Sequence, residues 1–146
     1  MLWGSYPAKI DEKSRIRLPA ICRQKLPETV DNTYYITSDN GKRAQLYPLP
    51  VWERIVQKFQ KASGYDDTVQ KLQMFTSYYG ALSEMDPQGR IVIPQKLRET
   101  AQLSGDVTVV GKIDHLEIWN AQALEDYVKG IHFTGEDRKH LTEQGF

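Results

Sequence analysis

The chain has 146 residues, with 19 basic and 19 acidic side chains and a formal net charge of zero. This balance excludes a uniformly basic nucleic-acid coat but leaves room for a local basic patch. The single cysteine, Cys22, excludes an intrachain disulfide, and we expect it to be a small buried hydrophobe. No apolar run reaches the length of a membrane span, and residues 1–7 lack a signal-peptide pattern, so we expect a cytoplasmic protein with no membrane partner.

The first half of the chain predicts a β-rich unit closed by helices. Residues 15–18 form a strand with alternating faces, and Pro19 ends that strand and suits the first turn of a helix. Asn40-Gly41 is typical of a hairpin turn, and the apolar spacing from Val51 to Lys61 is helical. In chain order, the predicted elements are a strand at 8–10, a turn at 11–14, a strand at 15–18, a helix to about 26, strands at 34–37 and 44–47, and helices at 51–61 and 66–78.

The second half repeats the first. Residues 84–101 match residues 9–26 after a shift of 75, through the pairs Asp11/Asp86, Arg15/Arg90, Ile16/Ile91, Leu18/Ile93, Pro19/Pro94 and Arg23/Arg98. Residues 45–47 and 117–119 form a second matching pair, each followed by a helical pattern. Duplication is the simplest explanation. We predict strands at 81–85, 90–93, 107–110 and 116–119, and a division into a module with its closing helix (1–62), a bridging helix (63–78), a second module with its closing helix (79–131) and a polar tail (132–146), which is loosely ordered or weakly helical.

The clearest chemical unit is the turn Asp86-Pro87-Gln88-Gly89-Arg90. An Asp at the first position accepts hydrogen bonds from the amides that follow it, Pro presets φ, and Gly tolerates a positive φ. Arg90 therefore leaves a tight turn at a fixed place. The Asp86 carboxylate can hold its guanidinium there by a charge-assisted hydrogen bond.

The first copy of this turn, Asp11-Glu12-Lys13-Ser14-Arg15, carries more positive charge. Lys13 lies on the turn itself, and Arg17 shares a strand face with Arg15. Residues 9–25 hold six basic and two acidic side chains, a net charge of +4, whereas residues 84–100 hold three of each. The basic face is therefore predicted in the first repeat, where side chains on a rigid hairpin can neutralise phosphates and contact base edges.

An Asp and an Arg four residues apart can also form a purely structural ion pair that shapes a turn. Under this interpretation Asp11 and Asp86 form turns rather than contact DNA. Arg90 is then structural as well, because its sequence neighbours are not basic. We therefore predict that Arg15 is the main DNA contact, and that the second turn has a lesser or assembly-dependent role in binding.

Two such turns, each followed by a strand and a proline, resemble the AbrB/SpoVT family of swapped-hairpin β-modules. Two modules in one chain of this length resemble the MraZ family of bacterial transcriptional regulators. The match extends from Gly4 to about Val128, and its motifs are Asp11–Arg15 with Leu18-Pro19, Leu46-Tyr47-Pro48, Asp86–Arg90 with Ile93-Pro94, and Val110-Gly111 before Glu117-Ile118-Trp119. The resemblance implies an α+β fold of two pseudo-repeated AbrB/SpoVT-like β-barrel modules with bridging and flanking helices.

The resemblance also implies a function. Members of the family bind repeated boxes in double-stranded promoter DNA as ring-shaped homo-oligomers, and usually repress the promoter of their own division and cell-wall operon, which implies association with the nucleoid. Ser14 stands where the family pattern favours Gly, so we expect the first turn to differ in shape. The DNA-binding positions carried over are Asp11, Lys13, Arg15, Asp86 and Arg90, and the strand pattern adds Arg17.

Three other functions compete with DNA binding. An enzyme is disfavoured because His115, His132 and His140 lack metal-ligand spacing and no phosphate loop or nucleophile motif occurs, so we expect no catalytic residue, metal, cofactor or small-molecule substrate. An oligomerisation or protein-interaction module without direct DNA binding is compatible with the zero net charge and the aromatic content. An antitoxin of the same fold would have one module and a toxin-binding tail, which the duplication disfavours.

Overall fold

The computed structural model describes residues 1–27 and 29–146, with Val30 described by its backbone alone. It shows one eight-stranded sheet with helices around it. The first half contains β1 (Ser5–Ile10), β2 (Arg15–Arg17), α1 (Ala20–Lys25), η1 (Val30–Asn32), β3 (Thr33–Thr37), β4 (Ala44–Pro48), α2 (Leu49–Lys61) and α3 (Asp67–Tyr78). The second half contains β5 (Ala81–Glu84), β6 (Arg90–Val92), α4 (Gln95–Thr100), β7 (Gly105–Gly111), β8 (Leu116–Asn120), α5 (Ala121–Lys129) and α6 (Gly135–Glu143).

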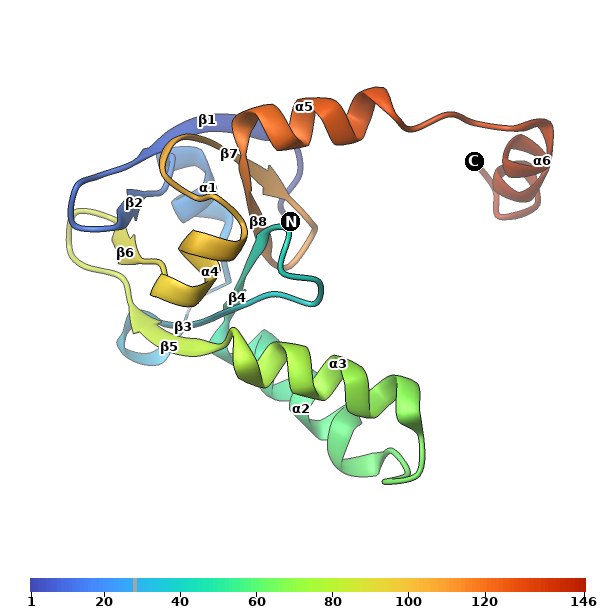
Figure 1. The fold of residues 1–146 in the computed structure, drawn as a ribbon, viewed down its shortest axis with the longest axis horizontal. Helices are drawn as coiled ribbons and strands as arrows, with labels where there is room; N and C mark the ends of the chain where they lie inside the picture. The colour runs from blue at the N-terminus through green and yellow to red at the C-terminus, as the bar shows by residue number, and fades with distance from the viewer. Residues whose placement is uncertain (28) are drawn as a thin grey trace.

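The sheet curves into a nearly closed barrel in which strands of the two halves are interleaved (Figure 1). The strand order is β5-β3-β4-β8-β7-β1-β2-β6, and the pairs are antiparallel. β1 pairs along its whole length with β7 of the second half, and β5 pairs in the same way with β3 of the first. Contacts between β5 and β6, the two ends of this order, bring the sheet close to closure.

An approximate twofold relation connects the two halves at the places where equivalent strands meet. In the β2–β6 pair, Ile16 lies opposite Ile91, its own counterpart after the shift of 75 residues. In the β4–β8 pair, Gln45 lies opposite its counterpart Glu117. Both halves therefore contribute strands to one sheet and side chains to one core.

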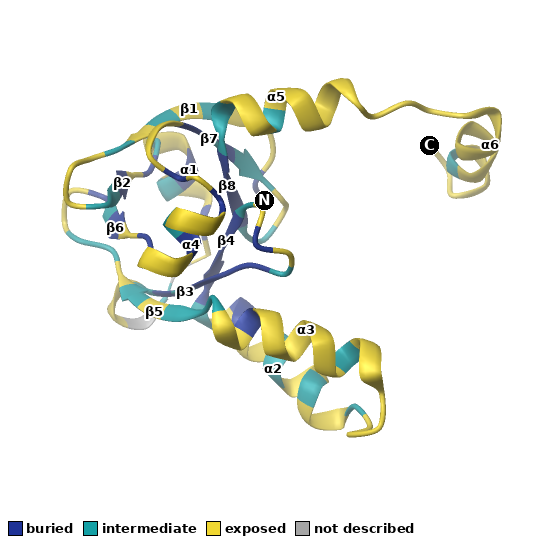
Figure 2. Cartoon of the chain, viewed as in Figure 1, coloured by how far each residue is buried: buried dark blue, intermediate teal, exposed yellow. Residues whose placement is uncertain are grey.

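The core lies inside the barrel, because alternate residues of each strand point inward (Figure 2). The two short helices α1 and α4 contribute Cys22 and Leu97 to the same core cluster, at equivalent positions of the repeat. Cys22 is 1% exposed, which confirms the predicted small buried hydrophobe. The fully buried strand residues include Ile16, Ile36, Leu46, Ile91, Val109 and Ile118.

The longer helices project from two opposite sides of the barrel (Figure 1). α2 and α3 form a hairpin below the barrel, α5 lies above it, and α6 stands away at the end of an extended segment. Pro48 precedes α2, and Asp66 caps α3 by accepting a hydrogen bond from the amide of Val69. Thr134 and Asp137 form a capping box that starts α6.

The predicted α+β fold with a β-barrel and flanking helices is confirmed. The predicted strands and helices match the observed ones to within about three residues at their ends; β1, for example, begins at Ser5 rather than at Ala8. The polar tail contains a regular helix, α6, of nine residues. Among the described residues, no helix combines the length and the apolar character needed to cross a membrane.

Candidate nucleic-acid interface

The first turn is held by the carboxylate of Asp11. Its Oδ1 accepts hydrogen bonds from the amides of Lys13 and Arg15, each at 2.9 Å, and its Oδ2 accepts one from Nε of Arg15 at 2.9 Å. The amide of Arg15 above all, together with its guanidinium, lowers the pKa of Asp11. The carboxylate is therefore ionised at neutral pH and fixes the Arg15 side chain where the strand begins.

The second turn has the same hydrogen bonds. Oδ1 of Asp86 accepts from the amides of Gln88 and Arg90 at 2.9 and 2.8 Å, and Oδ2 accepts from Nε of Arg90 at 2.7 Å. These bonds lower the pKa of Asp86. Ser14 has a φ of 68° and Gly89 a φ of 78°. The expectation that Ser14 changes the shape of the first turn is therefore wrong, because the surrounding hydrogen bonds hold the serine in a glycine-like conformation.

The two turns lie at opposite ends of one short two-stranded ribbon, and both project from the same side of the barrel (Figure 1). Each turn is joined to the strand of the other half. The amide of Leu18, after β2, donates to the carbonyl of Gly89 at 3.0 Å, and the amide of Ile93, after β6, donates to the carbonyl of Ser14 at 3.1 Å. The relative position of the two turns is thus fixed by backbone hydrogen bonds.

The ribbon has one face in the core and one in solvent. Ile16 and Ile91 are buried between the strands and the barrel interior, at 0% and 1% exposure. Residues on either side of them in a strand point the other way. We call the solvent face of β2 and β6, together with residues 11–14 and 86–89, the ribbon surface. Its outward strand residues are Arg15, Arg17, Arg90 and Val92.

The second turn receives further positive charge from the first half of the chain. Arg17 lies opposite Arg90 in the ribbon, and its Nε donates to the carbonyl of Gln88 at 3.1 Å. A Cβ placed on Gly89 would lie 2.5 Å from Cδ of Arg23, so this arginine packs directly on the turn. The inference that the surroundings of Arg90 are not basic is therefore wrong, although it holds for its sequence neighbours.

Arg23 is a basic residue that packs on the second turn and that the sequence-based site did not include. Gly89 is the signal that could have indicated it, because a residue without a Cβ permits close packing of a neighbouring side chain. At the first turn Ser14 does carry a Cβ, and Arg98, the counterpart of Arg23, donates its Nε to the carbonyl of Ile93 at 3.1 Å instead.

All the sequence-predicted site residues lie on the ribbon surface. The two aspartates form the turns, as the structural interpretation expects. Arg15 and Arg90 bond to them through Nε, and within the described residues their Nη atoms make no further side-chain hydrogen bond, so these donors can bond to another group without breaking the turn. The predicted residues brought together are Asp11, Lys13, Arg15, Arg17, Asp86 and Arg90.

The chain is similar to proteins of one family. The family model described as "MraZ protein, putative antitoxin-like" matches residues 80–143. A protein of Koribacter versatilis named "Transcriptional regulator MraZ" is 40% identical over 146 residues, covering 99% of both chains. A protein of the same name from Acidobacterium capsulatum is 39% identical, and the match covers 99% of both chains. Another from Nitrosospira multiformis is 34% identical, and the match covers 84% of this chain and 83% of the relative. The chain therefore belongs to the MraZ family of transcriptional regulators.

Proposed function

We propose that this regulator binds double-stranded promoter DNA in a sequence-specific manner through the ribbon surface. The observation that carries the proposal is the pairing of β2 with β6, which places Arg15, Arg17 and Arg90 on one rigid face. The major groove of B-DNA admits a two-stranded β-ribbon, and arginine can donate to guanine edges as well as to phosphates. A chain with no net charge can bind DNA in this way, because its positive charge is concentrated at the contact.

We further propose that the chain acts as a ring-shaped homo-oligomer on repeated boxes and represses the promoter of its own division and cell-wall operon, in the cytoplasm and on the nucleoid. One ribbon touches few phosphates, and repeated ribbons on repeated boxes multiply the contacts. In this proposal residues 1–62 and 79–131 are two modules joined by the helix of 63–78, and residues 132–146 form a tail.

The direct test is a fluorescence titration of a duplex carrying the repeated boxes of the chain's own promoter, at several salt concentrations. We expect the logarithm of the affinity to fall linearly with the logarithm of the salt concentration. Arg17→Ala should reduce that slope by about 0.9 for each ribbon on the duplex, which is about a fivefold loss of affinity per ribbon at physiological salt. The reason is that Arg17 is exposed and makes no ion pair among the described residues.

Lys61→Ala is the matched control, because Lys61 is also exposed but lies at the far end of α2, away from the ribbon (Figure 1). The slope of log affinity against log salt concentration for Lys61→Ala should equal that of the unchanged protein. Absence of binding at low salt would contradict the proposal and favour an oligomerisation module without direct DNA binding. A reporter under the chain's own promoter tests the sign of regulation, and expression that rises with the protein would contradict repression.

A further inference from the structure

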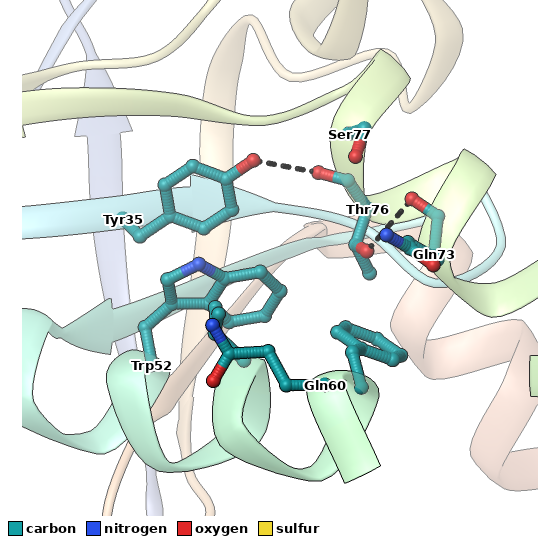
Figure 3. A pocket seen from close by; sticks show the side chains of 8 residues that line it. Tyr35, Trp52, Gln60, Gln73, Thr76 and Ser77 are labelled. Atoms are coloured by element: carbon teal, nitrogen blue, oxygen red, sulfur yellow. Dashed lines mark hydrogen bonds between the residues drawn. The ribbon is translucent and has the colours of Figure 1, made fainter. Parts of the chain in front are cut away.

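A cleft of about 400 Å³ separates α2 from α3 beside the barrel (Figure 3). Its end next to the barrel is fixed, because the hydroxyls of Tyr35 and Thr37 in β3 both donate to the carbonyl of Thr76 in α3, at 2.8 and 2.7 Å. Residues 62–66 join the two helices at the far end (Figure 1). The cleft is therefore held at both ends, and its volume is in the range of small-molecule sites, about 300–1,000 Å³.

The α2 side of the cleft is apolar and largely aromatic. Trp52, Val56 and Phe59 line it, and their spacing places them on one side of the helix. Trp52 stacks on Tyr35 with ring centroids 4.3 Å apart, and Phe59 lies edge-on to Trp52 with centroids 6.5 Å apart. A flat ring that enters the cleft therefore meets positioned aromatic side chains, which favour stacked or edge-to-face contacts.

The α3 side of the cleft is polar, although it faces the apolar side of α2. Gln73, Thr76 and Ser77 line the cleft from α3. The apolar residues Met74 and Tyr78 of the same helix lie outside the cleft and are 69% and 56% exposed. α3 therefore does not bury the apolar side of α2, and a departure of this kind from the usual packing of apolar helix faces is expected at functional sites.

Two glutamines line the cleft from different helices, Gln60 from α2 and Gln73 from α3 (Figure 3). In the described part of the chain neither side-chain amide makes a hydrogen bond; the bond drawn at Gln73 ends on its backbone carbonyl. Each amide offers donors and an acceptor, a combination that can pair with the edge of a purine. None of the residues that line the cleft is charged, so they offer no counter-charge to a phosphate or a carboxylate.

We propose that this cleft is a small-molecule site for a neutral, flat heteroaromatic ring of the size of a purine base. The ring contacts Trp52 and Phe59 on the α2 side, and its polar edge exchanges hydrogen bonds with the amides of Gln60 and Gln73. The aromatic side chains provide apolar contact, the two amides select a ring with donors and acceptors, and the uncharged lining selects against anions. The site lies on the helix hairpin, outside the ribbon surface, and does not depend on DNA binding.

Calorimetric titration of the full chain with adenine tests the site, and it is done without DNA, so its outcome is separate from that of the proposed function. Gln60→Leu and Gln73→Leu should each weaken adenine binding about tenfold, because a polar edge of the ring then faces an apolar side chain. Gln57→Leu and Gln70→Leu are the matched controls, since these exposed glutamines lie about one turn earlier on the same two helices and do not line the cleft. Both controls should bind adenine as the unchanged protein does.

Indole separates recognition by the amides from simple apolar binding, because it has a similar size but lacks the acceptor nitrogens of a purine. We expect indole to bind about tenfold more weakly than adenine and to be insensitive to Gln60→Leu. Adenine should also raise the Tm of the unchanged protein, as a ligand of the folded state does. The proposal would be overturned if adenine at millimolar concentration gave neither heat nor a rise in Tm, if indole bound as tightly as adenine, or if the control variants lost as much affinity as Gln60→Leu and Gln73→Leu.

Discussion

Ser14→Gly is expected to stabilise the protein, because Ser14 has a φ of 68°, in the region that favours glycine. Removing the side chain relieves about 1–2 kcal/mol of left-handed backbone strain. Glycine loses more conformational entropy on folding, which costs about 0.5–1 kcal/mol. The net gain is about 0.5–1 kcal/mol, and the turn should keep its shape because the bonds to Asp11 involve backbone amides and Arg15.

Gly89→Ser is the matched reverse exchange. It should destabilise by about 1 kcal/mol, because the serine must adopt a φ of 78°. Its Cβ would also displace Arg23, but Arg98, the counterpart of Arg23 in the other repeat, donates to the carbonyl of Ile93, so an arginine at this position can turn to a carbonyl instead. Both variants are measured by denaturant unfolding at one protein concentration, since assembly would couple stability to concentration. A Ser14→Gly protein that is less stable than the unchanged one would refute the strain assigned to this turn.

Three further results are expected. Arg15→Ala and Arg90→Ala should weaken DNA binding to a similar extent in the same titration, because the fold places basic residues beside both arginines, Lys13 at the first turn and Arg17 and Arg23 at the second; a loss of binding from only one of the two variants would contradict this expectation. Burial raises the pKa of Tyr47 to about 12, so the resulting stability is fully present below pH ~10 and is lost toward pH 12, by about 2–3 kcal/mol. Tyr47→Phe should remove this alkaline loss from unfolding curves, and an unchanged loss would assign it to other groups. The pKa of Asp86 is lowered in the folded protein, so its carboxylate contributes stability that is fully present above the usual aspartate range and is lost as the pH falls through the lowered pKa. Asp86→Asn should therefore flatten the acid limb of the curve of stability against pH, and an unaltered limb would count against this assignment.

The local elements could be predicted from the sequence because their signals are local. Pro19 and Pro94 follow strands and precede short helices, and Asn40-Gly41 lies between two strands, as the turn chemistry requires. The Asp-x-x-x-Arg spacing predicts both turns, since their hydrogen bonds connect residues within five positions. The error at Ser14 arose from using residue preference alone, without the carboxylate bonds that outweigh it.

The pairing between the halves could not be predicted in the same way. Ile16 lies opposite Ile91, 75 positions along the chain, and a repeat in the sequence is equally compatible with two separate hairpins. The net charge of a sequence segment likewise does not tell where the fold places its charged side chains. Arg17 and Arg23 count toward the first repeat in the sequence, but the fold places both of them at the second turn. A local charge count therefore assigned the basic face to one repeat, whereas the folded surface has basic residues at both ends.

The ribbon contributes Ile16 and Ile91 to the shared core and is also the proposed DNA contact, and the alternation of residues along its strands keeps these two roles on separate faces. A change at the buried Ile16 removes packing between the halves, so fold and binding should be lost together. A change at the exposed Arg17, one residue further along, leaves that packing in place and should affect binding alone. Because β2 and β6 come from different halves of the chain, neither repeat can supply the whole surface. The ordering of both turns on one face therefore requires the complete barrel.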